Sequence, residues 1–246
     1  MVPSLAREYE NKLKKLENSK LINDSTRILD TATVSSIRCL GLGSITVSSQ
    51  AMYQLCFISL IKNHLEKTHH NSEIRVTLWD PVFTDEETSF LKNEFNYIVD
   101  EKEPLRTEDT LYFMPHFPIV ALENIITKHK PRYIFSNNLL VYTFKFTDTK
   151  YFELYPNCAR IVKLIQSELK NKPKEENQTS DFQIVSRKKK ISKRTQYVPK
   201  TVHYDFESAY FANVNFIEVS EGNNSDRPWS NAFTDLAFFE IISKNK

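Results

Sequence analysis

The chain has 246 residues and a formal net charge of +2, and 40% of its residues are hydrophobic and 12% aromatic. A chain of this length and composition is expected to form one domain, with or without appendages, around a sizeable core. The small net charge excludes a global field that would attract nucleic acid or an acidic membrane surface.

The cysteines and the apolar runs indicate the compartment. Cys39, Cys56 and Cys158 are odd in number and widely spaced, so they suggest neither a disulfide framework nor a zinc site. The N-terminus lacks the apolar core of a signal peptide, and the longest nearly apolar run, residues 51–61, is too short to span a bilayer. We therefore expect a soluble protein of the cytoplasm, with an additional nuclear location left open, and no membrane partner.

The N-terminal segment is expected to carry one helix. Apolar residues recur at helical spacing over residues 4–20, and residues 21–34 then form a connector. We divide the chain accordingly into residues 1–30, an N-terminal helix and connector, and residues 31–246, an α/β domain.

Beyond the connector, strand-like and helix-like segments alternate. Strands are expected at residues 36–42, 73–80, 96–99, 109–115 and 132–140, helices at residues 48–67, 84–95, 118–130 and 152–169, and late C-terminal strands at residues 211–219 and 232–242. This alternation predicts βαβ units and an α/β fold with a Rossmann-like, mostly parallel sheet and helices on both faces.

Residues 171–200 interrupt this pattern with a polar stretch that lacks apolar periodicity. We expect a flexible insertion there. Its basic cluster, residues 187–194, is expected to be a solvated run, with a nuclear signal or a contact to an acidic partner as alternatives. Aromatic residues do not interleave with the basic ones as stacking on nucleic acid requires, so a nucleic-acid partner is not expected.

Several polar or glycine residues follow predicted strands, at the sheet edge where open parallel sheets bind ligands. These candidate ligand-binding residues are Gly41, Gly43, Ser44, Asp80, His116 and Asn137. Residues far apart in the sequence are thereby expected to converge on one edge.

Each candidate has a physical role to offer. Gly41 and Gly43 allow a backbone turn to approach a ligand closely, and Asp80 can accept hydrogen bonds from ribose hydroxyls. His116 can act as an acid, a base or a ligand of haem iron, and the Asn137 amide offers both a donor and an acceptor. The candidate cofactors are S-adenosylmethionine, a nucleotide or haem, and no catalytic residue or metal is assigned.

The structural alternatives stay open for the same residues. Thr46 occupies the third glycine position of a dinucleotide fingerprint, and Asp80 lies almost forty residues on rather than the typical twenty or so. The glycines can equally serve tight packing, Asp80 can fix the turn before Pro81, and His116 and Asn137 can be structural. His64, His69 and His70 lie on a helix end and in a polar loop, and they do not predict a metal site.

A set of ordered motifs resembles a known family. CLGLGSIT, QLCFISLI, LWDPVFTDEE, LYFMPHFP, NNLL, YFELYPNCARIVKLIQSEL and SNAFTDLAFFE follow one another as in the SRR-like (sensitivity to red light reduced) family, and within it they resemble the fungal benomyl-resistance members. The chain departs from the family where a Gly-Asn-Ser turn is usual and Ser136 precedes Asn137. Of the closing Ala-Phe-Asn-Asp-Thr-Ser motif it keeps Ala232, Phe233 and Asp235.

The resemblance implies a regulatory role. Plant members act in light signalling and the circadian clock, animal members are linked to haem metabolism, and fungal members are associated with microtubule-related processes. We therefore expect a regulatory protein, not an enzyme, that influences microtubule stability through protein partners. The alternatives are a methyltransferase-like or nucleotide-binding Rossmann enzyme and a haem-binding regulator, and the oligomeric state stays open.

Overall fold

The computed structural model describes residues 3–68, 73–100, 108–171, 201–219 and 227–244. Within them the elements follow in this order: α1 (Pro3–Leu16), α2 (Lys20–Leu29), β1 (Ser36–Leu40), α3 (Ser49–Thr68), β2 (Arg75–Trp79), α4 (Asp85–Phe95), β3 (Ile98–Val99), β4 (Thr110–Met114), α5 (Ile119–His129), β5 (Tyr133–Asn137), the 3-10 helix η1 (Leu139–Phe144), α6 (Asp148–Leu154), α7 (Pro156–Asn171), β6 (Phe211–Glu218) and β7 (Leu236–Ser243). The predicted insertion and its basic cluster lie almost entirely outside the described residues.

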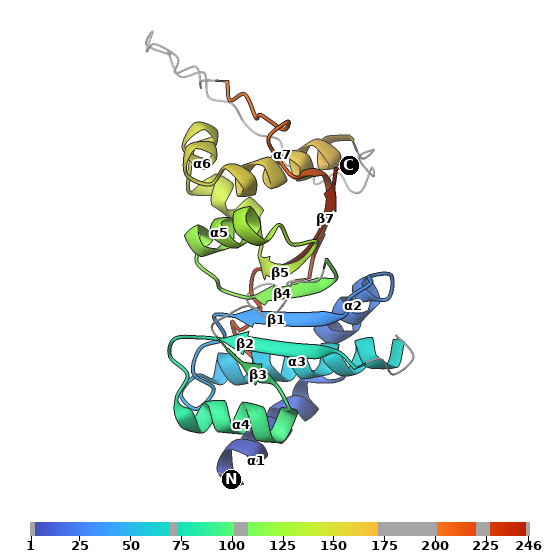
Figure 1. The fold of residues 1–246 in the computed structure, drawn as a ribbon, viewed down its shortest axis with the longest axis vertical. Coiled ribbons are helices and arrows are strands. Elements are labelled where there is room, and N and C mark those ends of the chain that lie inside the picture. The colour runs from blue at the N-terminus through green and yellow to red at the C-terminus, as the bar shows by residue number, and fades with distance from the viewer. Residues whose placement is uncertain (1–2, 69–72, 101–107, 172–200, 220–226, 245–246) are drawn as a thin grey trace, which may run out of the picture.

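A seven-stranded sheet forms the centre of the molecule, with the strand order β3-β2-β1-β4-β5-β7-β6 (Figure 1). The first five of these strands are parallel, whereas β7 runs antiparallel to both of its neighbours. The prediction of a mostly parallel sheet in an α/β fold is therefore confirmed. The last strand of the chain, β7, pairs with β5, and β6 lies at the edge of the sheet.

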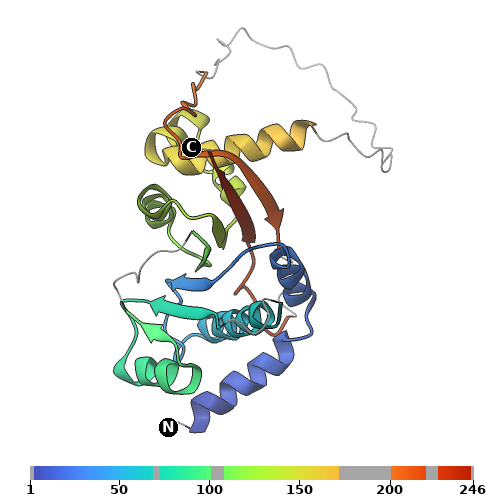
Figure 2. The same ribbon diagram turned by 45° about the vertical axis from the view of Figure 1, so that its right-hand side comes forward.

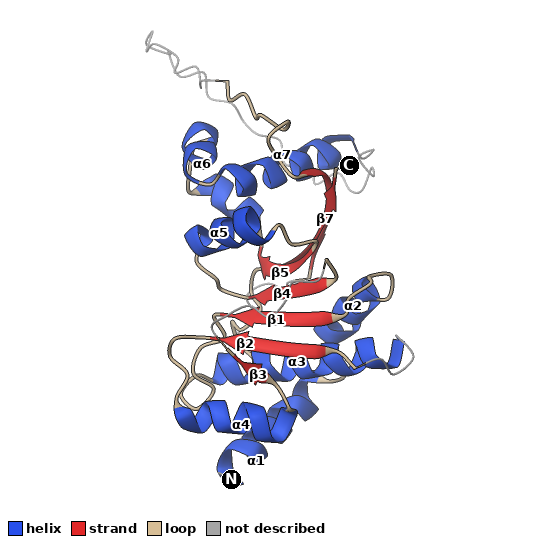
Figure 3. Cartoon of the chain, viewed as in Figure 1, coloured by secondary structure: helices blue, strands red, loops and turns tan. Residues whose placement is uncertain are grey.

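Helices pack on each side of this sheet because successive strand residues point to opposite faces. Ile37 and Cys39 of β1 belong to a core cluster with residues of α1 to α4, whereas Leu40 belongs to a second cluster with residues of α5 and α7. All residues of β4 and β5 are buried, as expected for parallel strands that are covered on both faces. Figure 3 shows the two groups of helices and the strands between them.

The N-terminal segment differs from the prediction because it holds two helices. The first helix ends at Leu16, and α2 replaces the predicted connector. Ser19 caps α2 by accepting a hydrogen bond from the Ile22 N–H, and Leu29 is among the residues that α2 buries. The prediction missed this helix because its pattern is short and its polar residues resemble those of a loop.

The region after β5 also differs. The strand ends at Asn137, and η1 follows where the prediction extended the strand to residue 140. Asn138 accepts a hydrogen bond from the Leu140 N–H, which starts the new turn. The single predicted helix over residues 152–169 is in fact two helices, α6 and α7, and the second one begins at Pro156.

The last two strands run side by side in Figure 2, and their buried residues share a core cluster with those of α7. A hydrogen bond from Arg160 of α7 to Ser208, at 2.8 Å, attaches the segment that precedes β6. In the described part of the chain no helix is both long and apolar enough to cross a membrane.

Candidate functional site

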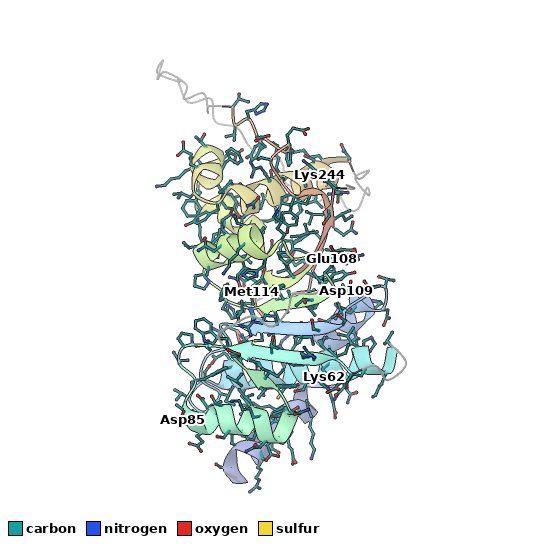
Figure 4. The ribbon with its side chains drawn as sticks, in the orientation of Figure 1. Lys62, Asp85, Glu108, Asp109, Met114 and Lys244 are labelled. Atoms are coloured by element: carbon teal, nitrogen blue, oxygen red, sulfur yellow. The ribbon has the colours of Figure 1, made fainter. Side chains whose placement is uncertain are left out.

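The carboxyl ends of the parallel strands lie at the edge of the sheet that faces left in Figure 4. There Met114 labels the end of β4, and Asp109, which precedes the strand, lies at the other edge. The loops after β1, β2, β4 and β5 therefore meet at one edge, and all six predicted residues lie in or directly before these loops.

The loops after β1 and β2 are joined by Asp80. The Gly43 N–H donates a hydrogen bond to Asp80 Oδ2 at 2.8 Å, and the Val82 N–H donates to Oδ1 at 3.0 Å. Both carboxylate oxygens thus hold backbone groups. The structure brings Asp80 to the glycine loop, and it also shows the turn-fixing role that the sequence left as an alternative.

The two glycines are needed for different reasons. Both have positive φ, +71° at Gly41 and +80° at Gly43, which a residue with a Cβ adopts only at a cost. A Cβ on Gly41 would lie 2.7 Å from Cδ2 of Phe117, so the aromatic ring packs on the bare backbone. A Cβ on Gly43 would meet nothing closer than the Ala51 Cβ at 3.8 Å, so this position is open. What approaches Gly41 is the protein's own side chain.

Glu87 organises the rest of the glycine loop. Its Oε1 accepts hydrogen bonds from the Ser44 hydroxyl at 2.6 Å and from the Thr46 N–H and hydroxyl, both at 2.9 Å. Its Oε2 accepts from the Thr84 N–H, which completes the capping box of α4. Burial by itself raises the pKa of this carboxyl, but the hydrogen bonds outweigh it, so the pKa of Glu87 is lowered.

His116 lies on the other half of the edge. Its backbone φ is +53°, an uncommon value for a residue with a Cβ. The ring Nε2 lies 2.9 Å from the Asn231 carbonyl oxygen and 3.1 Å from that of Ala232, and because both are acceptors this nitrogen carries a proton. The other ring nitrogen lies 3.7 Å from Asp235 Oδ1, beyond hydrogen-bond distance but within reach of an ion pair.

Asn137 and Tyr142 lie beside this histidine loop. The Asn137 amide donates a hydrogen bond to the Phe117 carbonyl at 2.9 Å, and its Oδ1 is buried without a hydrogen-bond partner in the described part of the chain. Burial raises the pKa of the Tyr142 phenol, partly offset by a hydrogen bond from Asn137, and the nearby Asp235 carboxylate raises it further. The edge therefore has a polar cluster, which we call the histidine cluster: His116, Asn137, Tyr142 and Asp235.

Phe117 connects the two halves of the edge, since its ring touches Gly41 and its carbonyl binds Asn137. Glu87 and Tyr142 are not among the residues that the sequence predicted for this site. The capping-box spacing of Thr84 and Glu87 is a signal in the sequence that could have identified Glu87. Nothing in the sequence marks Tyr142, which lies on η1, a helix that was not predicted. Asp235 was noted only as a residue of the closing motif.

No group of histidine, cysteine or acidic side chains that could hold a metal ion is present among the described residues. His64 instead forms a 2.7 Å contact with Asp30 at the end of α3. The three cysteines are all free and buried. Burial raises the pKa of the Cys56 thiol to about 12, so this thiol stays protonated at neutral pH.

The comparisons with known proteins agree on one family. A 110-residue stretch is 30% identical to the SRR1-like protein of Drosophila melanogaster, and this stretch covers 43% of the present chain and 37% of the fly protein. No solved structure gives a significant match. The family model of the SRR1 domain matches residues 13–240, which include both halves of the carboxyl edge. The chain therefore belongs to the SRR1 domain family.

Proposed function

We propose that the protein is a regulatory protein that presents the carboxyl edge of its sheet to a protein partner. The supporting observation is where its exposed apolar side chains lie. One exposed apolar residue follows each of β1, β2, β4 and β5, in that order Val47, Val82, Val120 and Phe144. Among the described residues, the most exposed large apolar side chains are those of Phe144, at 91%, and Val47, at 87%. Exposed large apolar side chains that follow strands ending at the same edge of the sheet support an interaction surface there.

The polar groups of this edge support a regulatory role over a catalytic one. The carboxylates of Asp80 and Glu87 already bind loop N–H groups, and the proton on His116 Nε2 is directed at backbone carbonyls. These interactions fix the shape of the loops. A fixed surface that combines exposed apolar side chains with polar groups is suited to recognition of another protein.

The process we propose is microtubule stability, in the cytoplasm and in part in the nucleus. Its support is the resemblance of the motifs to the fungal benomyl-resistance members of the family. The partner is then a protein of microtubule regulation that contacts the exposed apolar side chains of the carboxyl edge.

A complementation experiment tests both parts of this proposal. A strain that lacks the gene should be more sensitive to benomyl, and the wild-type protein should restore growth. The double variant Val47→Ser, Phe144→Ser should fold but fail to restore growth, because it removes apolar contact area from the partner surface. The control is Ile242→Ser, which changes an exposed apolar residue at the far end of β7, beyond Glu240, which pairs with Tyr133 at the start of β5.

Unchanged benomyl sensitivity in the deletion strain would reject the microtubule role. Full rescue by the edge variant, at wild-type protein levels, would reject the carboxyl edge as the partner surface.

The strand order favours a second candidate, a methyltransferase-like or nucleotide-binding enzyme. The order β3-β2-β1-β4-β5 is that of the corresponding strands in a Rossmann sheet, and a reversed strand between β5 and β6 is typical of methyltransferase-like sheets. On this ground we propose a Rossmann-like arrangement. The open position at Gly43 would then hold the amino-acid end of the cofactor, and Asp80 its ribose.

A thermal-shift panel with S-adenosylmethionine, NAD, ATP and haem tests this candidate. A shift with one ligand that disappears in the folded Asp80→Asn variant would support it, whereas no shift with any ligand would reject it. Haem belongs in the panel as the third hypothesis, although a bond from iron to His116 Nε2 would have to displace the contacts to Asn231 and Ala232.

A further inference from the structure

A cavity lies between the sheet and α5, and it borders the carboxyl edge at Phe117. It has a volume of about 740 Å³, which is in the range of small-molecule sites. The described residues that line it come from β1, β2 and β4, from the loop after β4, and from α5, and they include Arg38, Trp79, Tyr112, Phe117, Ala121 and Lys128. We call this cavity the α5 pocket.

The position of the pocket follows from how the helices divide over the sheet. The helices α1 to α4 pack on the opposite face, and on this face α5 and α7 pack mainly over β4, β5 and β7. Strands β1 and β2 contribute Arg38, Leu40 and Trp79 to the pocket beside α5. The pocket is thus a part of the sheet face that the described helices leave open.

Aromatic side chains form much of the lining. Trp79 ends β2, Tyr112 lies in the middle of β4, and Phe117 follows that strand. The Tyr112 ring also contacts the His129 ring, with 6.2 Å between the ring centroids. Flat aromatic walls favour a flat ligand, because rings stack on or against one another.

Arg38, Lys128 and His129 are the basic side chains of the pocket. Arg38 is 3% exposed in the centre of β1, and Lys128 and His129 come from the last turn of α5. No carboxylate is present among the described lining residues. A guanidinium presents a planar fork of donors that matches a carboxylate or phosphate, so an anionic group complements this lining.

We propose that the α5 pocket is a ligand site for an aromatic ring that carries a phosphate or carboxylate, with a mononucleotide as the representative ligand. The ring stacks on the aromatic walls, and the anionic group binds towards Arg38 and Lys128. The pocket borders the carboxyl edge at Phe117, whose ring also packs on Gly41. The groups that would bind the ligand differ from those of the glycine loop and of the partner surface, so the proposal has a test of its own.

Tryptophan fluorescence can report binding directly. The chain has two tryptophans, and Trp229 lies in the core cluster on the opposite side of the sheet. In the Trp229→Phe variant the emission therefore comes from Trp79 in the pocket wall. Titration with AMP should change this emission saturably. Adenosine lacks the anion and ribose 5-phosphate lacks the ring, so each should bind at least about tenfold more weakly than AMP.

Pocket variants then locate the binding. In the Trp229→Phe background, Lys128→Gln should weaken AMP binding about fivefold. Ala121→Phe should abolish it by filling the cavity. The matched control is Lys67→Gln, which changes a lysine in the last turn of α3 on the opposite face and should leave AMP binding unchanged.

Two results would overturn the proposal. One is a folded protein whose Trp79 emission does not respond to AMP at millimolar concentration. The other is binding that survives Ala121→Phe and Lys128→Gln but is lost in Asp80→Asn, since this would place the nucleotide at the glycine loop. If the Val47→Ser, Phe144→Ser variant fails to restore growth on benomyl, that outcome leaves the test of AMP binding unaffected.

Discussion

At the residue scale, the two glycines of the first loop serve distinct purposes. Gly41 allows the Phe117 ring to contact the backbone, and Gly43 provides a left-handed turn whose N–H reaches Asp80. The sequence pattern does not distinguish the two positions. They differ in their neighbours in space, so substitutions at the two positions should destabilise the protein to different extents.

Alanine substitutions should therefore have unequal effects. Gly43→Ala should cost about 1–2 kcal/mol, the penalty for a Cβ at positive φ. Gly41→Ala should cost more than that because it adds a clash with Phe117 at 2.7 Å. Urea denaturation of both variants measures the difference. In the background of Phe117→Ala, the extra cost of Gly41→Ala should disappear, and equal costs in the wild-type background would contradict the packing role.

Glu87 makes stability depend on pH through its loop hydrogen bonds. Because its pKa is lowered on folding, the folded state binds fewer protons there than the unfolded state, whose glutamate titrates near about 4.3. Glu87 therefore contributes fully to the stability of the fold above the pKa of the unfolded state. This contribution is lost as the pH falls through the lower pKa of the folded state.

Glu87→Gln should consequently destabilise the protein at neutral pH, and the difference from wild type should shrink on acidification. Urea midpoints measured from about pH 7 down to about pH 3 check this. Glu86→Gln changes an exposed carboxylate on the same turn and should leave the pH profile nearly unchanged. A difference for Glu87→Gln that grows as pH falls would contradict the assigned direction.

At the element scale, helix α7 depends on a carboxylate from another helix. Glu123 of α5 is 7% exposed, and it accepts hydrogen bonds from the backbone N–H groups of Asn157 at 3.0 Å and Cys158 at 2.8 Å. These N–H groups lie in the first turn of α7 and have no partner within the helix. Glu123 therefore caps α7 from outside and attaches it to α5.

Glu123→Gln should destabilise the protein by about 2 kcal/mol, because it replaces an acceptor of two buried N–H groups by an uncharged amide. Chemical denaturation measures the free energy of unfolding, and Glu94→Gln, on the exposed side of α4, is the control with little expected effect. A cost for Glu123→Gln no larger than that of the control would show that this cap does not stabilise α7.

At the scale of the whole molecule, the two core clusters share the same strands. Phe57 of α3 packs on the rings of Phe113 and Phe135 on one face, whereas Ile161 of α7 is buried in the cluster on the other face. Neither cluster can lose its packing without disturbing the strands that support the other. The sheet thereby couples the two faces into one cooperative unit.

Phe57→Ala and Ile161→Ala should each lower the stability of the whole molecule, by about 3–5 and about 2–5 kcal/mol respectively. Each variant should still unfold in one transition that circular dichroism and tryptophan fluorescence report at the same denaturant concentration. Separate transitions for the two probes would show that the faces unfold independently.

The sequence predicted the central fold well because its signals are local. Apolar periodicity identified the helices and strands from residue 36 to Asn137, although some ends differ. Errors occurred where local signals were ambiguous. The helix α2 resembles a polar connector, and Pro156 lies within a continuous apolar pattern but begins a new helix.

The candidate site divides in the same way. The sequence by itself determined the α/β alternation and therefore placed Gly41, Asp80, His116 and Asn137 at one edge, because parallel strands end on the same side. Only the tertiary structure decided what these residues touch: Phe117 on Gly41, the loop N–H groups on Asp80, and the carbonyls of residues 231 and 232 on His116. Such contacts join groups up to 116 residues apart, and their distances depend on how the whole sheet packs rather than on any local pattern.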